Sequence, residues 1–159
     1  MATAVQRRPL RRRVQARVMN LLNIPMRRIL GLPFATPLGR RLMLVHIVGC
    51  KTGRLYRQPV SYTQDGQTLL TPGGGRWKLN LFPDQQVRIR VRGRDVWATP
   101  EIISDLDAVN SYLTKMTAAN PRMKSFIGIP QEPSGRFDQQ RLKQAVDYGF
   151  RVVRWYLDT

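Results

Sequence analysis

The chain has 159 residues, of which 42% are hydrophobic, and it carries a formal net charge of +17. This length predicts one domain with a full core, and the composition excludes a disordered chain. Because the chain holds one cysteine and one histidine, an internal disulfide and a zinc site built from these residue types are excluded, and we expect no metal.

The positive charge is concentrated in the N-terminal part of the chain. Of the 27 Lys and Arg residues, 13 precede Asp65, and none of the 10 Asp and Glu residues does. Over residues 5–30, apolar side chains recur every three to four positions with arginines mostly between them, which predicts a basic amphipathic helix. Such a helix fits an anionic membrane surface, where each nearby cation contributes about 1 kcal/mol. Alternatively, it packs on the rest of the protein with its arginines in solvent.

The sequence predicts neither a membrane span nor a secretory signal. No run reaches the roughly 18 apolar residues that a span needs, and Asn20, Asn23 and Pro25 interrupt the apolar part of the N-terminal segment. Nucleic acid is not the expected partner, because no helix-turn-helix, zinc-finger or RRM pattern accompanies the charge. We therefore expect a cytoplasmic protein, peripheral at the inner face of the cell membrane if the basic helix binds lipid.

A connector then separates the basic segment from a folded domain. Pro33, Pro37 and Gly39 mark this connector, so we expect a basic amphipathic segment over 1–39 and one domain over 40–159.

The remainder of the chain predicts strands joined by hairpin turns. Asp65-Gly66 is a strong hairpin signal, and Ser104 with Asp107 forms a capping-box-like helix start. Because the strands do not alternate with long helices, we expect an α+β, mostly antiparallel barrel with peripheral helices. The expected strands are 41–48, 57–64, 68–71, 86–92, 95–103 and 148–157, and the expected helices are 104–119 and 136–146.

The turn between the first two strands predicts an anion site. It contains Gly49 and Gly53, and backbone N–H groups together with positive charge are what a bound phosphate requires. A solvated basic hairpin loop accounts for the same residues equally well. The cations in or beside this turn are Lys51, Arg54 and Arg57.

The order of these motifs resembles the deazaflavin-dependent nitroreductase family, a branch of the split β-barrel flavin-binding proteins. The family's GRKSG turn, followed by basic residues and a proline, reads here Gly49-Cys50-Lys51-Thr52-Gly53 with Pro59-Val60 after it. A small-residue loop follows at Thr71-Pro72-Gly73-Gly74, and a Trp-x-x-Asn-Leu pattern at 77–81. The resemblance covers residues 40–102, and Cys50 stands where the family usually has a cation.

The resemblance implies a split β-barrel that binds coenzyme F420 (8-hydroxy-5-deazaflavin). The phosphate and acidic tail would lie against the cationic turn, and the ring along the small-residue loop. Trp77 would stack on or wall the pocket, although a tryptophan on a short helix suits the core equally. The implied activity is an oxidoreductase of nitroreductase or quinone reductase type, transferring a hydride to a quinone, nitro or enone compound. The cofactor-binding residues implied are Lys51, Thr52, Gly53, Arg54, Arg57, Gln58, Pro59, Val60, Thr71, Pro72, Gly73, Gly74, Trp77 and Asn80.

Several alternatives stay open at this point. FMN could replace the deazaflavin and would need less cationic surface, and a non-catalytic lipid-binding, haem-binding or membrane-docking module fits the charge pattern. A homodimer across a sheet face is a further expectation. The candidate proton donors are Tyr62, Tyr148 and Tyr156.

Overall fold

The protein is described from a computed structural model. The structure describes residues 25, 27–28, 41–73 and 76–158. The expected basic helix and connector therefore lie outside the described residues, apart from Pro25, Arg27 and Arg28, which are helical. In the part of the chain that is described, no helix is long and apolar enough to cross a membrane.

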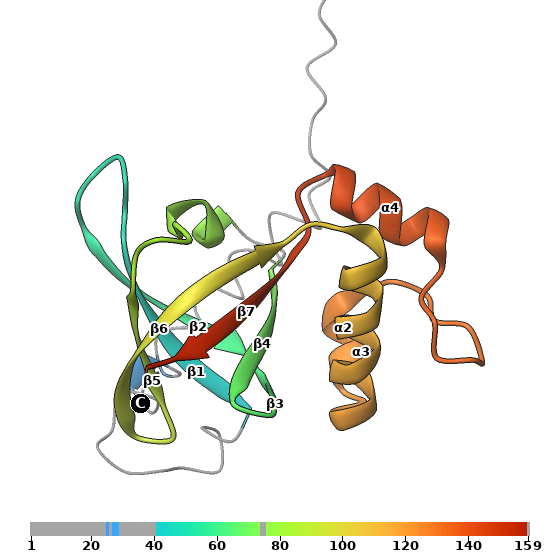
Figure 1. The fold of residues 1–159 in the computed structure, drawn as a ribbon, viewed down its shortest axis with the longest axis horizontal. Coiled ribbons are helices and arrows are strands. Elements are labelled where there is room, and N and C mark those ends of the chain that lie inside the picture. Colours follow the sequence, from blue (N-terminus) through green and yellow to red (C-terminus); the bar gives the residue numbers. More distant parts are fainter. Residues whose placement is uncertain (1–24, 26, 29–40, 74–75, 159) are drawn as a thin grey trace, which may run out of the picture.

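An antiparallel seven-stranded sheet forms the body of the protein, in the order β2-β1-β5-β6-β7-β4-β3 (Figure 1). All of its strand pairs are antiparallel. This confirms the mostly antiparallel α+β class. The strands are β1 (Leu42–Val48), β2 (Leu55–Ser61), β3 (Thr63–Asp65), β4 (Thr68–Gly73), β5 (Val87–Val91), β6 (Arg94–Ile103) and β7 (Arg151–Leu157).

The sheet curls on itself because its two end strands are joined in sequence. β2 and β3 stand at opposite ends of the order, yet Tyr62 alone separates them in the chain. β2 consequently lies beside β4. The result is a curled half-barrel, consistent with a split β-barrel.

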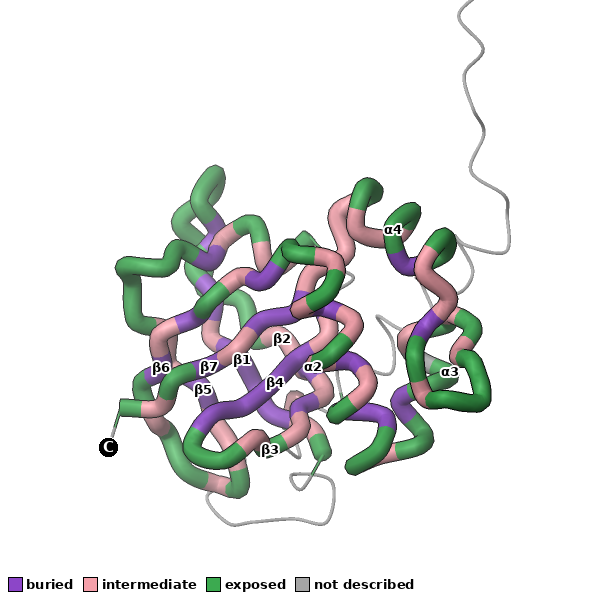
Figure 2. Tube along the Cα trace, turned by 45° about the vertical axis from the view of Figure 1, so that its right-hand side comes forward, coloured by how far each residue is buried: buried purple, intermediate pink, exposed green. Residues whose placement is uncertain are grey.

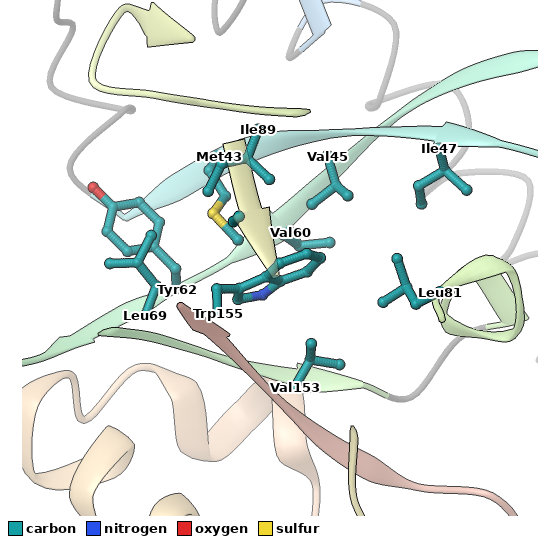
Figure 3. Packing of buried hydrophobic residues seen from close by; sticks show 11 residues of the cluster. Met43, Val45, Ile47, Val60, Tyr62, Leu69, Leu81, Ile89, Val153 and Trp155 are labelled. Carbon is teal, nitrogen blue, oxygen red and sulfur yellow. The ribbon is translucent and has the colours of Figure 1, made fainter. Parts of the chain in front are cut away.

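The barrel interior is filled by the inward-facing residues of the strands. Alternate residues of β1, namely Met43, Val45 and Ile47, point into it, as period-two burial requires. Trp155 of β7 is fully buried at the centre of this cluster (Figure 3) and donates from Nε1 to Thr71 Oγ1 at 3.1 Å. This bond satisfies the buried polar tip of the indole.

A second core lies between the sheet and three helices, α2 (Leu106–Ala119), α3 (Met123–Ile127) and α4 (Gln139–Asp147). The helices gather at one end of the sheet, and the buried stretches run along both the strands and the helix faces that meet them (Figure 2). Leu70 and Val152 contribute the sheet side of this core. The peripheral position expected for the helices is therefore confirmed.

Three local expectations differ from the structure. The expected strand 57–64 is two strands, because the backbone leaves the β1 ladder at Ser61 and joins β4 at Thr63. The helix start uses Asp105, whose Oδ2 accepts from Ala108 N at 3.0 Å, and not the pair Ser104 and Asp107. The short helix α3 was not expected.

Candidate functional site

The barrel is open between β2 and β4. β2 pairs with β1 on one side, and β4 pairs with β3 only as far as Leu70, so β4 leaves its last residues unpaired on that side within the described sheet. Pro59 and Pro72 lie on the two facing edges, where the missing N–H of proline leaves no donor unsatisfied. A cavity of about 180 Å³ occupies this opening, here called the slit. Its lining residues are Pro59, Val60, Ser61, Pro72, Trp77, Ile127 and Phe150.

The slit is walled on one side by the short 3-10 helix η2 (Arg76–Asn80). Trp77 of this helix stacks on Trp155, with ring centroids 6.5 Å apart and planes 8° apart. Trp77 is half-buried and packs against the barrel core as well as lining the slit. Both roles expected for this residue are therefore compatible with its position.

The cationic turn is held against η2 by one side chain. Cys50 N donates to Asn80 Oδ1 at 3.0 Å, and Asn80 Nδ2 donates to Trp77 O at 3.3 Å. Figure 1 shows the β1–β2 turn and η2 on the same side of the barrel. The turn and the slit wall therefore belong to one connected unit.

The turn itself is tightly closed by its backbone. Gly49 N donates to Arg54 O, and Gly53 N donates to Gly49 O, both at 2.8 Å. A side chain at Gly49 would meet Tyr56 Cε2 at 2.8 Å, so the Tyr56 ring would have to shift to admit any larger residue there. Lys51 and Arg54 are exposed, and neither makes an ion pair within the described residues.

Lys78 is a functional candidate that the sequence reasoning missed. Its Nζ donates to Gly73 O on the adjoining β4 strand. Burial, and secondarily the positive charge of Arg151, lowers the pKa of Lys78 below its ordinary value. A side chain at Gly73 would meet Arg151 O and Lys78 Cδ, each at 3.2 Å, so this backbone and the lysine are in close contact. A lysine within a short polar helix gives no sequence signal of such burial.

The structure brings four of the expected cofactor residues, Pro59, Val60, Pro72 and Trp77, together in the slit. Lys51, Thr52, Gly53 and Arg54 lie on the exposed turn, to which Asn80 is bonded.

The remaining expected residues lie elsewhere. The side chain of Thr71 is fully buried and accepts from Trp155, so only its backbone could meet a ligand. The carbonyl oxygen of Gly73 accepts from Lys78 Nζ, so the lysine side chain covers it. The side chain of Gln58 donates from Nε2 to Pro59 O at 3.3 Å. Arg57 lies opposite His46 on the outer face of the sheet. Gly74 lies outside the described residues.

The three tyrosine candidates lie apart from one another, and none lines the slit. Tyr62 is buried at the other end of the barrel core, where Arg92 Nε donates to its hydroxyl at 3.2 Å (Figure 3). Tyr148 is 93% exposed at the end of α4. Tyr156 donates to Glu101 Oε2 at 2.6 Å on the outer face, and this bond, with some burial, raises the pKa of its hydroxyl.

Ile127 and Phe150 also line the slit and were not expected there. They come from α3 and from the segment before β7, far along the chain from the turn and η2. Their approach is a product of the tertiary fold, so no local pattern could have indicated it. Within the described residues, no group of three or more His, Cys, Asp or Glu side chains could hold a metal ion.

Comparison with known proteins supports the fold. No family model and no curated protein matches the sequence. The fold is similar to that of a candidate 5-nitroimidazole antibiotic resistance protein from Bacteroides thetaiotaomicron, with a TM-score of 0.53 and 13% identity over 77% of this chain and 76% of that chain. A chain described as a domain-swapped dimer matches with a TM-score of 0.50 and 14% identity over 86% of this chain and 98% of that chain.

An F420 reductase is similar at a TM-score of 0.46 and 15% identity, over 82% of this chain and 90% of that chain, which is too weak a likeness to carry an argument. At these identities the first two matches establish the fold alone. The curled antiparallel sheet, its slit and these matches together are consistent with a split-barrel protein.

Proposed function

We propose that this protein is a split-barrel oxidoreductase that binds the deazaflavin coenzyme F420 and reduces a quinone, nitro or enone compound. The observation that carries the proposal is the pair of hydrogen bonds made by the Asn80 side chain, which accepts from Cys50 N and donates to Trp77 O. These bonds join the cationic turn and the slit wall into one surface. A cofactor with a flat ring and an acidic tail has two ends of opposite character. This surface offers one matching region to each.

The slit residues fit the ring end of such a cofactor. Trp77, Pro59 and Pro72 present flat apolar faces, against which a planar ring packs. The cavity of about 180 Å³ is smaller than the roughly 300 Å³ at the lower end of small-molecule pockets. The slit would therefore hold the ring, and the rest of the cofactor would extend over the surface toward the turn.

The turn residues fit the acidic end. Lys51 and Arg54 are exposed and without ion-pair partners in the described chain, so both are available for charge-assisted hydrogen bonds to phosphate or carboxylate. Because the turn is closed by its own backbone bonds, these cations project from a fixed base.

When bound, a reduced deazaflavin supplies the hydride. The protein's own residues bind and orient: the slit wall excludes water from one side of a bound ring, and the turn anchors the tail. We include Lys78 in the proposal as a proton-holding group behind the slit wall, because its ammonium lies on Gly73 O and its pKa is lowered by burial.

The proposal also includes a peripheral location at the inner membrane face through the N-terminal segment, and a homodimer. The likeness to a domain-swapped dimer is consistent with the second of these.

Calorimetric titration of the full chain with oxidised F420, FMN and haem tests the proposal. We expect F420 to bind at tens of micromolar or tighter and FMN to bind more weakly, because FMN lacks the acidic tail. Absence of F420 binding in this range would overturn the proposal. Equal or tighter binding of FMN would favour a flavin-using barrel, and binding of haem alone would favour a non-catalytic module. Loss of F420H2 absorbance on adding menadione or a nitroarene then tests the reductase activity.

A further inference from the structure

A second and larger cavity lies on the outer face of the sheet. It has a volume of about 490 Å³, which is within the range of small-molecule sites. Strands β1, β2, β5 and β6, the segment before β5, the β1–β2 turn and Asn80 of η2 line it. It shares no lining residue with the slit. We call it the outer groove, defined by His46, Val48, Leu55, Phe82, Arg88 and Trp97.

A row of side chains crosses four adjacent strands at this groove. Arg57 of β2 pairs with His46 of β1, and Arg88 of β5 pairs with Trp97 of β6. His46 Nδ1 lies 3.2 Å from Arg88 O, which joins the two halves of the row. The core residues next to His46, Arg88 and Trp97 in sequence point inward, so these three side chains point outward. Arg57 lies on the same face through its pairing with His46. The row places two guanidinium groups and an imidazole beside an indole.

Arg88 has no anionic partner in the part of the chain that the structure describes. Its guanidinium makes no hydrogen bond or ion pair within the described residues, although the side chain is half-buried. Two residues along the same strand, Arg90 pairs with Asp95 at 2.9 Å. A half-buried cation loses part of its hydration, and an anion placed beside it would compensate for that loss.

The groove is also where exposed apolar side chains collect. Val48 is 59% exposed, Leu55 55%, Trp97 53% and Phe82 43%. Scattered single apolar residues are normal on a surface, whereas a contiguous group in a concave site marks a binding surface. An apolar wall beside an unpaired cation matches a ligand with an apolar body and one acidic head.

Charge decides against a second copy of this chain as the occupant. In a symmetric dimer the same patch would meet itself, which would bring Arg57 and Arg88 near their own copies on a chain of net charge +17. Like charges at such a contact are repulsive.

We propose that the outer groove binds a small anionic amphiphile, with a carboxylate or sulfonate head on Arg88 and an aromatic or alkyl body against Trp97 and Phe82. This site shares no lining residue with the slit, but Gly49, Cys50 and Asn80 of the turn unit also line it. A ligand in the groove would therefore lie beside the region proposed for the acidic end of the cofactor.

Matched pairs of small molecules test this proposal on the wild-type protein. The probes are 2-naphthoate against neutral 2-naphthalenemethanol, and decanoate against decanol, each followed by tryptophan fluorescence at pH 7.5. We expect the acids to bind about tenfold or more tightly than the neutral partners, as a charge-assisted hydrogen bond implies. The aromatic and alkyl pairs distinguish the two kinds of body. Equal affinity of acid and alcohol, or no binding at millimolar concentration, overturns the proposal.

Variants then locate the site. Arg88→Gln should reduce the affinity for the acids about tenfold and leave the alcohols unchanged. Arg94→Gln, which removes an exposed charge at the start of β6 that does not line the groove, should change neither. Trp97→Phe should remove the fluorescence change, because Trp77 and Trp155 are stacked on each other at the slit. A signal that persists in Trp97→Phe would place the ligand in the slit and overturn the proposal. So would a wild-type dimer that Trp97→Asp converts to a folded monomer, since the groove would then be an interface.

Discussion

Cys50 donates its backbone N–H to Asn80 Oδ1 at 3.0 Å, thirty residues further along the chain. Cys50 occupies the position where the resembled family usually carries a cation, so a charge is absent there while the backbone contact to η2 is present. In this protein the turn is positioned by a main-chain donor, which any residue except proline would supply.

Asn80→Ala should loosen the turn. It removes the acceptor for Cys50 and the donor to Trp77 O, each worth about 1 kcal/mol at a partly exposed site. We expect the thermal midpoint to fall by roughly 2–4 °C per kcal/mol lost and F420 affinity to fall several-fold. Asn80→Asp keeps the acceptor and should recover most of the thermal midpoint. An Asn80→Ala protein with an unchanged midpoint and unchanged affinity would contradict the role given to this residue.

Lys51→Ala and Arg54→Ala should each weaken F420 binding without altering stability. Both side chains are exposed and unpaired in the described chain, so their loss removes no native contact. The effect should shrink as ionic strength rises, because salt screens exposed charges. Titrations at low and high salt, with Arg94→Ala as a control of equal charge, measure this. If affinity is the same in all three variants, the acidic tail lies elsewhere.

Thr71→Val should be strongly destabilising for a single isosteric change. It leaves the buried Trp155 Nε1–H, now 3.1 Å from Thr71 Oγ1, without an acceptor, which costs about 1–3 kcal/mol. Urea unfolding measures the loss. The double variant Thr71→Val with Trp155→Phe supplies the matched control, because it removes both partners of the hydrogen bond. It should lose less unfolding free energy than the sum of the losses in the two single variants. Additive effects would show that the bond contributes nothing.

The stability of the protein should fall as the pH drops below about 6.5, the ordinary pKa of histidine. Burial, then the charges of Arg88 and Arg57, lower the pKa of His46; its bond to Arg88 O and the charge of Asp95 oppose this only in part. The unfolded chain therefore takes up the proton at a higher pH than the folded chain. The stabilisation from neutral His46 is present above the unfolded pKa and is lost on acidification.

Thermal midpoints at pH 7.5, 6.5 and 5.5 test this titration. The decline should be smaller in His46→Gln, which cannot gain the proton. Identical pH profiles for the two proteins would show that carboxylates elsewhere cause the decline.

Deleting residues 2–20 should abolish sedimentation with anionic liposomes, because this segment holds six of the arginines that the sequence places on the basic helix. Neutral liposomes provide the control for nonspecific trapping. Persistent binding by the shortened protein would assign the membrane contact to another surface.

Much of the fold could be predicted because the strands carry simple signals. The alternation of Val87, Ile89 and Val91 with arginines indicated β5, and Asp65-Gly66 indicated the β3–β4 hairpin. The break at Tyr62 could not be seen, because this inward-facing residue continues the alternation across the point where the strand changes partner.

For the site, the structure places Pro59, Pro72 and Trp77, which belong to separate sequence motifs, around one cavity. Whether they bind a cofactor stays a prediction. Ile127 and Phe150 could not be anticipated, since packing of the helical layer alone carries them to the slit.

The single-residue link at Tyr62 closes one end of the slit, and the opposite end, toward the β1–β2 turn, is open. β3 and β4 are paired up to Thr63 and Leu70, and beyond that pair no strand ladder joins β2 to β4 in the described sheet. The resistance of the slit to widening therefore differs between its two ends. Widening at the turn end only bends the edges of β2 and β4, whereas widening near Tyr62 would break hydrogen bonds between β3 and β4. Ligands of different thickness would therefore be accommodated by movement of the first half of β2. This is the part of the slit nearest to the cationic turn.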